Sequence, residues 1–349
     1  MAHKKQMWTG IIAAVVMAVM IFDAKTAFKG AAIGIDLCIR VVVPSLLPFV
    51  VISIIINTNL KGTHLRVLQP LGKLCGLPSG AESILALGLL GGYPIGAKAI
   101  TDAYKSRTIK RNDAQRLLGF CNNAGPAFIF GILGDIFPKY ITPWALWIIH
   151  ITSALLTGCI LKGKSKDRCN FAEKRPLTIP QALEQSVKTM TSICAWIIMF
   201  RVIICFIEKW FLWSLPQSLQ AGIIGSLELS NGCYEMRGIS NLGLRFILCS
   251  GILAFGGICV LMQTQSVTEE LGLGMYFPGK ILQTAISVIL AIITQNFIFE
   301  ESDQLSLSIN QYRTYLAGGV FVTMALIFRK KVVAFLRHMV YNNRKHLLN

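Results

Sequence analysis

The sequence predicts an all-α polytopic membrane protein built from two inverted repeats, each with a re-entrant hairpin and an interrupted helix. Composition is the first observation: 54% of the 349 residues are hydrophobic and 15% are charged, whereas a soluble domain carries roughly 25% charged residues. The second observation is a series of long uncharged runs, which suit membrane-spanning helices. The third is a pair of polar, glycine-rich breaks that recurs further along the chain.

These breaks are the most informative feature of the chain. The first pair covers residues 91–98 and 121–126, and the second covers 227–233 and 255–257. Hydrocarbon cannot hydrogen-bond the backbone groups that a break frees, so such a break must be buried in protein or line a wet cavity. Interrupted segments at matching places in two halves of a chain point to the binding site of a transporter. We therefore expect a solute-translocating membrane protein.

The charge distribution fits a membrane protein better than a nucleic-acid-binding one. The formal charge is +17, from 34 basic and 17 acidic residues. The basic residues gather in short tracts between apolar runs, which is typical of cytoplasmic loops. The tracts at 105–116, 162–175 and 329–345 therefore predict the cytoplasmic side, whereas the acidic residues at 300–303 predict the outside. The expected surroundings are a lipid bilayer, and no nucleic-acid partner is expected.

The N-terminal region, residues 1–43, predicts one membrane helix and one interfacial helix. No A-x-A-like cleavage site follows the apolar run 8–22, so this run reads as an uncleaved helix. Residues 24–43 mix charged and apolar side chains and end at Pro44, which favours an amphipathic helix lying along the interface.

The first repeat, residues 44–161, begins with a crossing at 45–60. The next run, 81–104, has basic residues on both flanks and breaks at 92–94, so it is expected to turn back as a re-entrant hairpin. The runs 117–137 and 141–161 then cross outward and back, the first of them interrupted.

A basic cytoplasmic linker, residues 162–185, leads to the second repeat at 186–299. Residues 300–349 complete the chain with a last membrane helix and a basic tail. Five crossings after the linker would place the linker and the tail on opposite sides, although both are basic. One run must therefore turn back, and 217–242 is the candidate because it is broken at 230–232. The runs after the linker are 186–207, 217–242, 246–263, 281–299 and 312–328.

The tip of the first hairpin is a candidate binding element. A helix that begins after Pro94 exposes unpaired N–H groups, which suit an anion or a polar ligand. The alternative is that small residues here only allow close helix packing. The spacing also resembles a phosphate-binding loop, but Ala97 precedes the lysine and no Ser or Thr follows it. The candidate residues of this tip are Gly92, Tyr93, Pro94, Gly96 and Lys98.

Polar residues at the other three breaks complete the predicted substrate or ion site. Asn122 and Asn123 could coordinate a cation, bind a solute, or only satisfy backbone groups that Pro126 leaves free. Glu228 is an intramembrane acid and marks an ion or proton path, unless it pairs structurally with Lys98. The remaining candidates are Ser230, Asn231, Gly256, Gly257 and Gln263, the last of which lines an inner mouth or only caps its helix.

Arg201 lies within an apolar run, where an arginine costs about 2.5–3.5 kcal/mol on insertion scales. It is expected either to face the cavity or to pair with an acid such as Glu228. Its role is otherwise left open by the sequence.

Catalytic and metal chemistry are not predicted. The ten cysteines include no C-x-x-C spacing and the five histidines include no paired spacing. No Ser/His/Asp or Cys/His constellation is discernible, so an enzyme is not expected. We expect no metal site and no cofactor, and a coupling ion, Na⁺ or H⁺, stays open.

Three stretches of the first half carry a family resemblance: Gly92-Tyr93-Pro94-Ile95-Gly96-Ala97-Lys98, Asp113-Ala114-Gln115-Arg116-Leu117-Leu118, and Cys121-Asn122-Asn123-Ala124-Gly125-Pro126-Ala127-Phe128. Together they resemble the Gate, or nucleoside-recognition, domain, and their order is similar to that of the YlbJ family of sporulation integral membrane proteins. The resemblance covers roughly residues 35–300. It implies a fold similar to concentrative nucleoside transporters and a role in forming heat-resistant spores, but it implies no particular solute.

These observations lead to a sporulation-associated secondary transporter of a small polar solute, nucleoside-like or anionic, as the expected function. One alternative is a non-transporting membrane scaffold that is needed for spore cortex or coat assembly. Others are the membrane subunit of an ATP-driven importer and a metal-ion transporter. A homo-oligomer and other sporulation membrane proteins are left open as partners.

The parity of the runs yields a testable topology in the cell membrane: eight spanning helices, two hairpins and both termini in the cytoplasm. Reporter fusions after Lys166 and after Asp303 should report opposite sides of the membrane. Fusions that report the same side would overturn the inverted-repeat topology.

Overall fold

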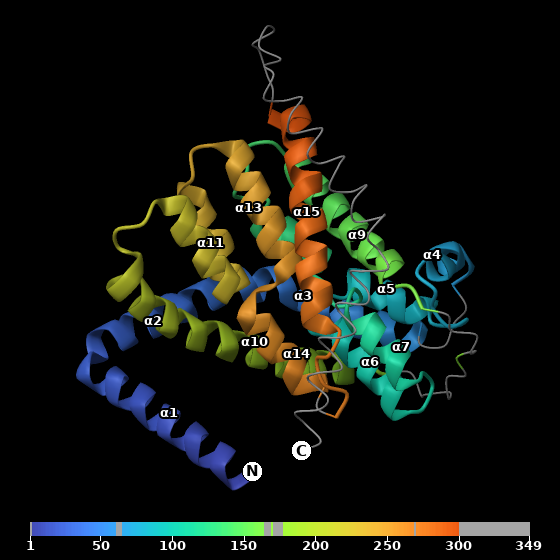
Figure 1. Ribbon diagram of the computed structural model, residues 1–349, viewed down its shortest axis with the longest axis horizontal. Helices are drawn as coiled ribbons and strands as arrows, with labels where there is room; N and C mark the ends of the chain where they lie inside the picture. The colour runs from blue at the N-terminus through green and yellow to red at the C-terminus, as the bar shows by residue number, and fades with distance from the viewer. Residues whose placement is uncertain (1, 61–64, 164–168, 170–176, 269, 300–349) are drawn as a thin grey trace, which may run out of the picture.

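In the computed structural model, the structure describes residues 2–60, 65–163, 169, 177–268 and 270–299 (Figure 1). Every regular element in these ranges is a helix, which confirms the predicted all-α class. Before the linker the elements are α1 (Ala2–Phe22), α2 (Ala24–Leu37), η1 (Cys38–Val42), α3 (Val43–Leu60), η2 (Arg66–Leu68), α4 (Gln69–Leu74), α5 (Glu82–Leu90), α6 (Ile95–Lys105), α7 (Arg111–Leu118), α8 (Pro126–Ile132) and α9 (Ile141–Ile160). After it come α10 (Ile179–Ile207), η3 (Glu208–Leu212), α11 (Gln217–Leu227), α12 (Leu229–Glu235), η4 (Met236–Gly238), α13 (Leu242–Phe255), α14 (Gly257–Thr268) and α15 (Tyr276–Phe299).

Two helices of the first half are interrupted where the glycine pattern predicts it. Residues 91–94 separate α5 from α6, and Gly92 has a φ of 79°, a left-handed conformation that glycine adopts without steric strain. Residues 119–125 separate α7 from α8, which starts at Pro126. Proline suits this first helical position because its missing N–H would have no helical partner there.

The second half has two corresponding interruptions. Glu228 is extended, with φ −144° and ψ 124°, and separates α11 from α12. Gly256 has a φ of 83° and ends α13, after which α14 begins at once. Both halves therefore contain two helix breaks in apolar sequence.

Five helical stretches of the described part are long and apolar enough to cross a membrane: Ala24–Ile56, Ile141–Ile160, Ile179–Leu212, Leu242–Thr268 and Tyr276–Phe299. The chain is thus an all-α protein with several candidate spans. Of the eight expected crossings, 8–22 corresponds to α1, whose apolar part is shorter, and 117–137 is divided between α7 and α8. The run 312–328, the acidic residues at 300–303 and most of the linker lie outside the described residues.

The expected end of the second segment at Pro44 is wrong. The chain stays helical through Pro44 because η1 is a π-helical turn, in which the Val43 amide donates to the Cys38 carbonyl five residues earlier. Ser45 Oγ donates to the Val41 and Val42 carbonyls at 2.6 and 3.2 Å. Pro44 itself has no amide to donate, and its ring is accommodated where the wider π-helical turn passes into α3.

Small residues let α2 approach α10 closely. Gly30 and Gly34 face α10, where an added Cβ would lie 2.7 Å from Val202 Cα and 2.9 Å from Ile198 Cα, respectively. This packing of small residues against a helix backbone is the usual way in which membrane helices associate. The amphipathic pattern of α2 thus reflects a close helix contact.

The two halves share their buried clusters. One cluster joins residues of α5, α6 and α7 to Leu271 and Tyr276 of the second half. The other joins α8 and α9 to α12, α13 and α15, and Figure 1 shows α13, α15 and α9 running alongside one another. The halves therefore form one packed body.

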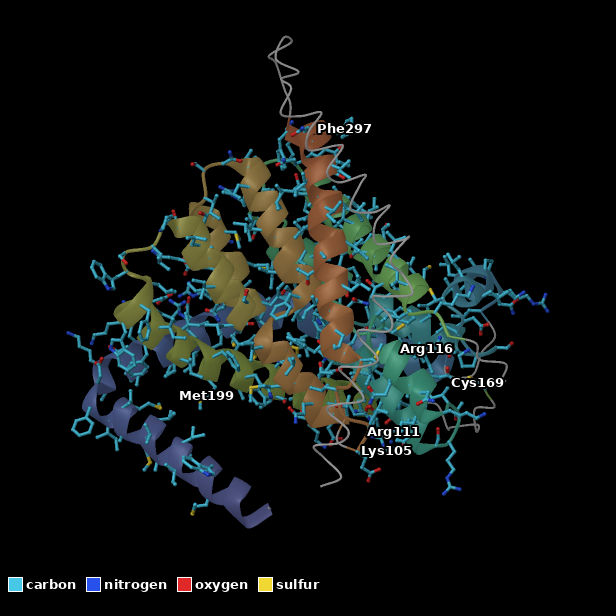
Figure 2. The ribbon with its side chains drawn as sticks, in the orientation of Figure 1. Lys105, Arg111, Arg116, Cys169, Met199 and Phe297 are labelled. Carbon is cyan, nitrogen blue, oxygen red and sulfur yellow. The ribbon has the colours of Figure 1, made fainter. Side chains whose placement is uncertain are left out.

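The basic tract at 105–116 lies at one end of the molecule (Figure 2). Arg116 donates to the Gly76 carbonyl at 2.7 Å, and Arg111 donates to the Leu271 carbonyl at 3.3 Å. The tract is thus tied, through Arg111, to the connection between α14 and α15. In the predicted topology the run 246–263 crosses back to the cytoplasm, so this connection is expected on the same side as the basic tract.

The tight crossing of α11 and α12 gives a stability prediction. A Cβ on Gly232 would collide with the backbone of Gly225, whereas a Cβ on Gly222 in the same hairpin meets nothing within 4 Å. We expect Gly232→Ala to lower the thermal unfolding midpoint of the purified protein by several degrees, corresponding to about 1–3 kcal/mol of overpacking.

Gly222→Ala is the matched control, and it should leave the midpoint unchanged or raise it slightly because alanine favours helix. Equal midpoints for the two variants would contradict the observed packing of the hairpin.

Candidate functional site

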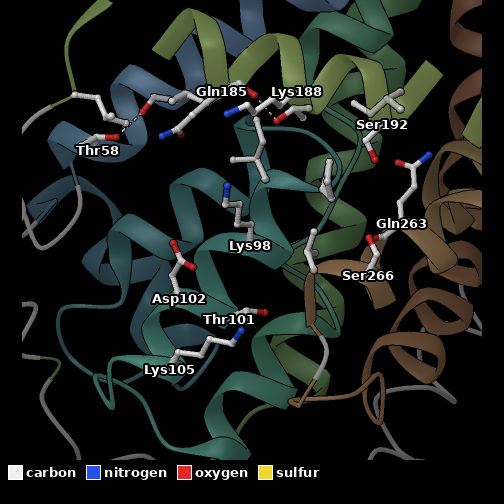
Figure 3. A pocket seen from close by; sticks show the side chains of 17 residues that line it. Thr58, Lys98, Thr101, Asp102, Lys105, Gln185, Lys188, Ser192, Gln263 and Ser266 are labelled. Carbon is white, nitrogen blue, oxygen red and sulfur yellow. Dashed lines mark hydrogen bonds between the residues drawn. The ribbon is translucent and has the colours of Figure 1, made fainter. Parts of the chain in front are cut away.

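A polar groove of about 690 Å³ opens between α3, α6, α10 and α14 (Figure 3). Small-molecule sites occupy roughly 300–1,000 Å³. Of the predicted site residues, Pro94, Lys98 and Gln263 line this groove. Its polar and charged lining consists of Thr58, Lys98, Thr101, Asp102, Lys105, Gln185, Lys188, Thr189, Ser192, Gln263 and Ser266.

Lys98 projects into the groove from α6 and makes no hydrogen bond or ion pair with the residues that the structure describes. Across the groove, Lys188 pairs with Glu184 at 2.7 Å. The expected alternative of a structural pair between Lys98 and Glu228 is therefore not observed. An ammonium group without a protein partner suits an anionic group of a ligand.

The hydroxyl groups of the groove present acceptors. Thr58 and Thr101 donate to carbonyls four residues earlier in their own helices, both at 2.9 Å, and Ser266 donates to a carbonyl three residues earlier at 2.8 Å. Since each O–H is used within its helix, the oxygen lone pairs remain for a ligand. The groove can therefore receive O–H or N–H donors as well as an anion.

A second, smaller cavity of about 60 Å³, here called the inner cavity, adjoins the groove and is lined by residues of three of the four breaks. Ile193 and Gln263 line both spaces. Gly125, next to the start of α8, also lines the inner cavity. The predicted site residues in its wall are Gly92, Tyr93, Glu228, Ser230 and Gln263.

Glu228 caps the start of α12 with both carboxylate oxygens. It accepts from the Ser230 amide at 2.9 Å, the Asn231 amide at 2.7 Å and Asn231 Nδ2 at 2.6 Å. The residue is 2% exposed, and no lysine or arginine of the described part forms a salt bridge with it. The break thus holds a buried acid whose protein partners are neutral.

Arg201 does not pair with Glu228, which corrects that expectation. Its two terminal nitrogens donate to Glu208 at 3.0 and 3.3 Å, and Glu235 lies 3.9 Å away. Arg201 thereby connects α10 and η3 to the end of α12. It positions the second hairpin and lines neither the groove nor the inner cavity.

Asn122 bridges the first hairpin to the interrupted helix of the second half. Its Oδ1 accepts from the Ala97 amide at 3.2 Å, and its Nδ2 donates to Thr264 Oγ1 at 2.9 Å. Gly96 makes this bridge short, because a Cβ there would collide with the Cys121 carbonyl. Asn122 is fully buried and holds α6 close to α14.

Asn123 belongs to a second network, which includes a lysine. Its Nδ2 donates to the Gly88 and Phe120 carbonyls at 3.0 and 2.7 Å, while its Oδ1 accepts from Lys280 Nζ at 3.1 Å and Gln283 Nε2 at 2.9 Å. Lys280 also donates to Tyr93 Oη at 3.2 Å. This network joins both breaks of the first half to α15.

The two glycines at the last break allow the hairpins to approach it. Gly256 packs on Tyr93, where an added Cβ would lie 3.0 Å from Tyr93 Oη, and Gly257 packs on Leu227, where it would lie 3.2 Å from the carbonyl oxygen. Tyr93 Oη also donates to the Leu253 carbonyl at 3.3 Å. The fourth break therefore touches the first and the third, and whether the breaks bind a solute stays a prediction.

Two polar residues of this region, Lys280 and His150, were not predicted from the sequence. Lys280 directly precedes the predicted run 281–299 and so falls outside it, but it is the fifth residue of α15 and 1% exposed. His150 accepts from the Ala124 amide at 3.2 Å. A lysine or histidine with apolar residues on both sides is the signal that could have found them.

Within the described residues, no group of three or more His, Cys, Asp or Glu side chains is arranged to hold a metal ion. The ten cysteines are all free, and Cys121 and Cys233 beside the breaks are buried.

The chain is similar to a sporulation protein of known sequence. Over 89% of this chain and 91% of the relative, it is 23% identical to the sporulation integral membrane protein YlbJ of Bacillus subtilis (strain 168). No family model matches the chain, and no solved structure matches it significantly. The likeness extends along nearly the whole of both chains and confirms the relationship to the YlbJ family that the motifs implied.

The buried arginine gives a prediction with a matched control. Glu208→Gln removes the main partner of Arg201, whose side chain is 9% exposed, and should destabilise the protein by about 1–3 kcal/mol because a buried charge loses its acceptor. Glu184→Gln breaks an ion pair whose side chains are 66% and 74% exposed and should change the unfolding midpoint little. Comparable losses in both variants would mean that the pair between Arg201 and Glu208 does not stabilise the fold.

Proposed function

We propose that this protein is a secondary transporter that carries a small polar solute across a membrane of the developing spore. The observation that carries the proposal is the convergence of the helix breaks beside a polar groove: three of them line the inner cavity, and the fourth packs on the first and the third. Broken helices whose polar groups converge on one place are how membrane transporters build a solute site. The name of the relative supports the connection to sporulation.

The order of the elements supports inverted repeats of the Gate type. In the first half, α3 is followed by the pair α5 and α6, the pair α7 and α8, and the long α9. In the second half, α10 is followed by α11 and α12, α13 and α14, and the long α15. We infer that the hairpins open to opposite sides and that a pseudo-two-fold axis in the membrane plane relates the halves.

The groove favours a solute that is anionic or nucleoside-like. Lys98 can receive an anionic group, while the oxygens of Thr58 and Thr101 can receive O–H or N–H donors. The inner cavity of about 60 Å³ has room for a few water molecules but not for such a solute. Passage therefore requires the hairpin tips to move apart, as alternating access demands.

An ion gradient is the expected energy source, because the sequence contains no nucleotide-binding motif. The solute would enter from the groove and pass between the hairpin tips. Gln263 and Ile193, which border both spaces, would be the first groups to move.

A membrane scaffold for cortex or coat assembly is the competing proposal. The observation in its favour is that the side chains of Asn122 and Asn123 form their hydrogen bonds with other groups of the protein. In this case the breaks would be kept for packing alone, and no solute would pass.

Uptake by the purified full-length protein in liposomes distinguishes the two proposals. The screen covers nucleosides, aromatic dicarboxylates and divalent metals, with protein-free liposomes as the blank. We expect uptake of a nucleoside or a dicarboxylate. If no solute is taken up while the same protein restores heat resistance to spores, the transporter proposal fails and the scaffold remains.

Variants at two of the breaks should impair uptake without preventing membrane insertion. Asn122→Ala removes the bridge between α6 and α14, and Glu228→Gln removes the charge from the inner cavity. A buried hydrogen bond is worth about 1 kcal/mol or more, so uptake should fall about fivefold or more.

Asn241→Ala is the matched control. Asn241 caps α13 at the surface, away from the groove and the inner cavity, so this variant should retain uptake. Full activity of Asn122→Ala and Glu228→Gln would mean that these polar side chains only satisfy backbone groups at the helix breaks.

A further inference from the structure

Lys280 is the most deeply buried cation of the described residues, and neither the groove nor the inner cavity includes it. It is 1% exposed and lies one turn inside α15. Its ammonium also lies 5.1 Å from the ring centre of Tyr93 and 5.9 Å from that of Tyr276. Removing an ammonium from water is strongly unfavourable unless other groups replace its hydration.

Three oxygens replace that hydration. Lys280 Nζ donates to Gln283 Oε1 at 2.9 Å, Asn123 Oδ1 at 3.1 Å and Tyr93 Oη at 3.2 Å. An ammonium has three N–H groups, and each of them therefore has an acceptor.

The three oxygens are held in place by other bonds. Asn123 donates through Nδ2 to two backbone carbonyls, Gln283 Nε2 donates to Asn123 Oδ1, and Tyr93 Oη donates to the Leu253 carbonyl. Their positions therefore do not depend on Lys280 alone. Such support from outside the coordinating atoms is what fixes the ligands of a metal site.

No carboxylate of the described residues forms a salt bridge with Lys280. The titratable groups around it are phenols, a thiol and an imidazole, namely Tyr93, Tyr276, Cys121 and His150. The ammonium is thus held by neutral oxygens only, which are also the ligands that hard metal cations prefer.

We propose that Lys280 is a tethered cation that occupies a monovalent cation site formed by Tyr93, Asn123 and Gln283. The oxygens come from two different helix breaks and from α15, so a cation at this point holds them together. Because the ammonium is covalently attached, the intact protein needs no Na⁺ or K⁺ from solution there. The proposal concerns the folded state and stands whether or not the protein transports a solute.

Removal of the ammonium should convert the position into an ordinary cation site. We expect Lys280→Ala to unfold at a lower temperature than the unaltered protein in choline chloride. Na⁺ or K⁺ should then raise its midpoint by several degrees in a saturable manner, because a ligand that binds only the folded state stabilises it. The measurement is thermal unfolding of the purified full-length protein in detergent, in NaCl, KCl or choline chloride at equal concentration.

Three controls make the result specific. The unaltered protein should have the same midpoint in all three salts. Lys280→Met fills the space with an apolar side chain and should be destabilised in all of them. Lys139→Ala removes a lysine that donates to the Ile298 carbonyl at 3.1 Å, and its midpoint should not depend on the cation.

A Lys280→Ala midpoint that is the same in the three salts would overturn the proposal, as would a Na⁺ or K⁺ dependence of the unaltered protein. If Lys280→Ala yields no folded protein in any salt, the double variant Lys280→Ala/Asn123→Asp supplies a carboxylate ligand. Na⁺ or K⁺ should then support its folding, and failure of this variant in every salt also counts against the cation site.

Discussion

Backbone groups that leave a helix in apolar surroundings must find partners within the protein, because neither lipid nor packed side chains can replace the lost bonds. Four helix breaks create this demand here. Asn122 accepts from the Ala97 amide, His150 accepts from the Ala124 amide, and Asn123 donates to two carbonyls. Glu228 serves the amides at the start of α12. The arrangement of the interior depends on these bonds, since each joins a break to a neighbouring helix or starts the next one.

These bonds distinguish side chains that satisfy the backbone at the breaks from side chains that are available to bind a solute. Amide groups that satisfy the backbone have little hydrogen-bonding capacity left for a solute, and Asn122 and Asn123 are fully buried. The groove differs, because Lys98 has no protein partner in the described part and the threonine oxygens keep free lone pairs. Under the proposed function, a solute would first be recognised in the groove, while the breaks would determine whether the path beyond it opens.

The breaks and most of the long helices could be predicted because their signals are local. Glycine, proline and polar residues within an apolar run predict a helix break from the local sequence alone. The hydrogen-bond and ion-pair partners of the buried polar side chains could not be predicted in this way. Arg201 finds Glu208 and Glu235 rather than Glu228 because a π-helical segment and the end of α12 lie beside it. Lys280 looks like a loop charge in the sequence, and only its contacts with the first half reveal a buried position. Pro44 is accommodated by a π-helical turn that composition does not indicate.

The two buried charges near the breaks bear on the coupling ion. Lys280 already fills the position formed by neutral oxygens, so in the proposed tethered-cation arrangement no Na⁺ is needed there. Glu228 is the other charged group at the breaks, and its protein partners are neutral donors. An anion that moves from Lys98 toward the inner cavity meets this carboxylate next, and like charges in a low-dielectric region repel strongly. Under the proposed function, a proton on Glu228 removes this repulsion, whereas bound Na⁺ would need oxygen ligands that the cap of α12 has already engaged. Of the two ions left open by the sequence, this arrangement favours H⁺.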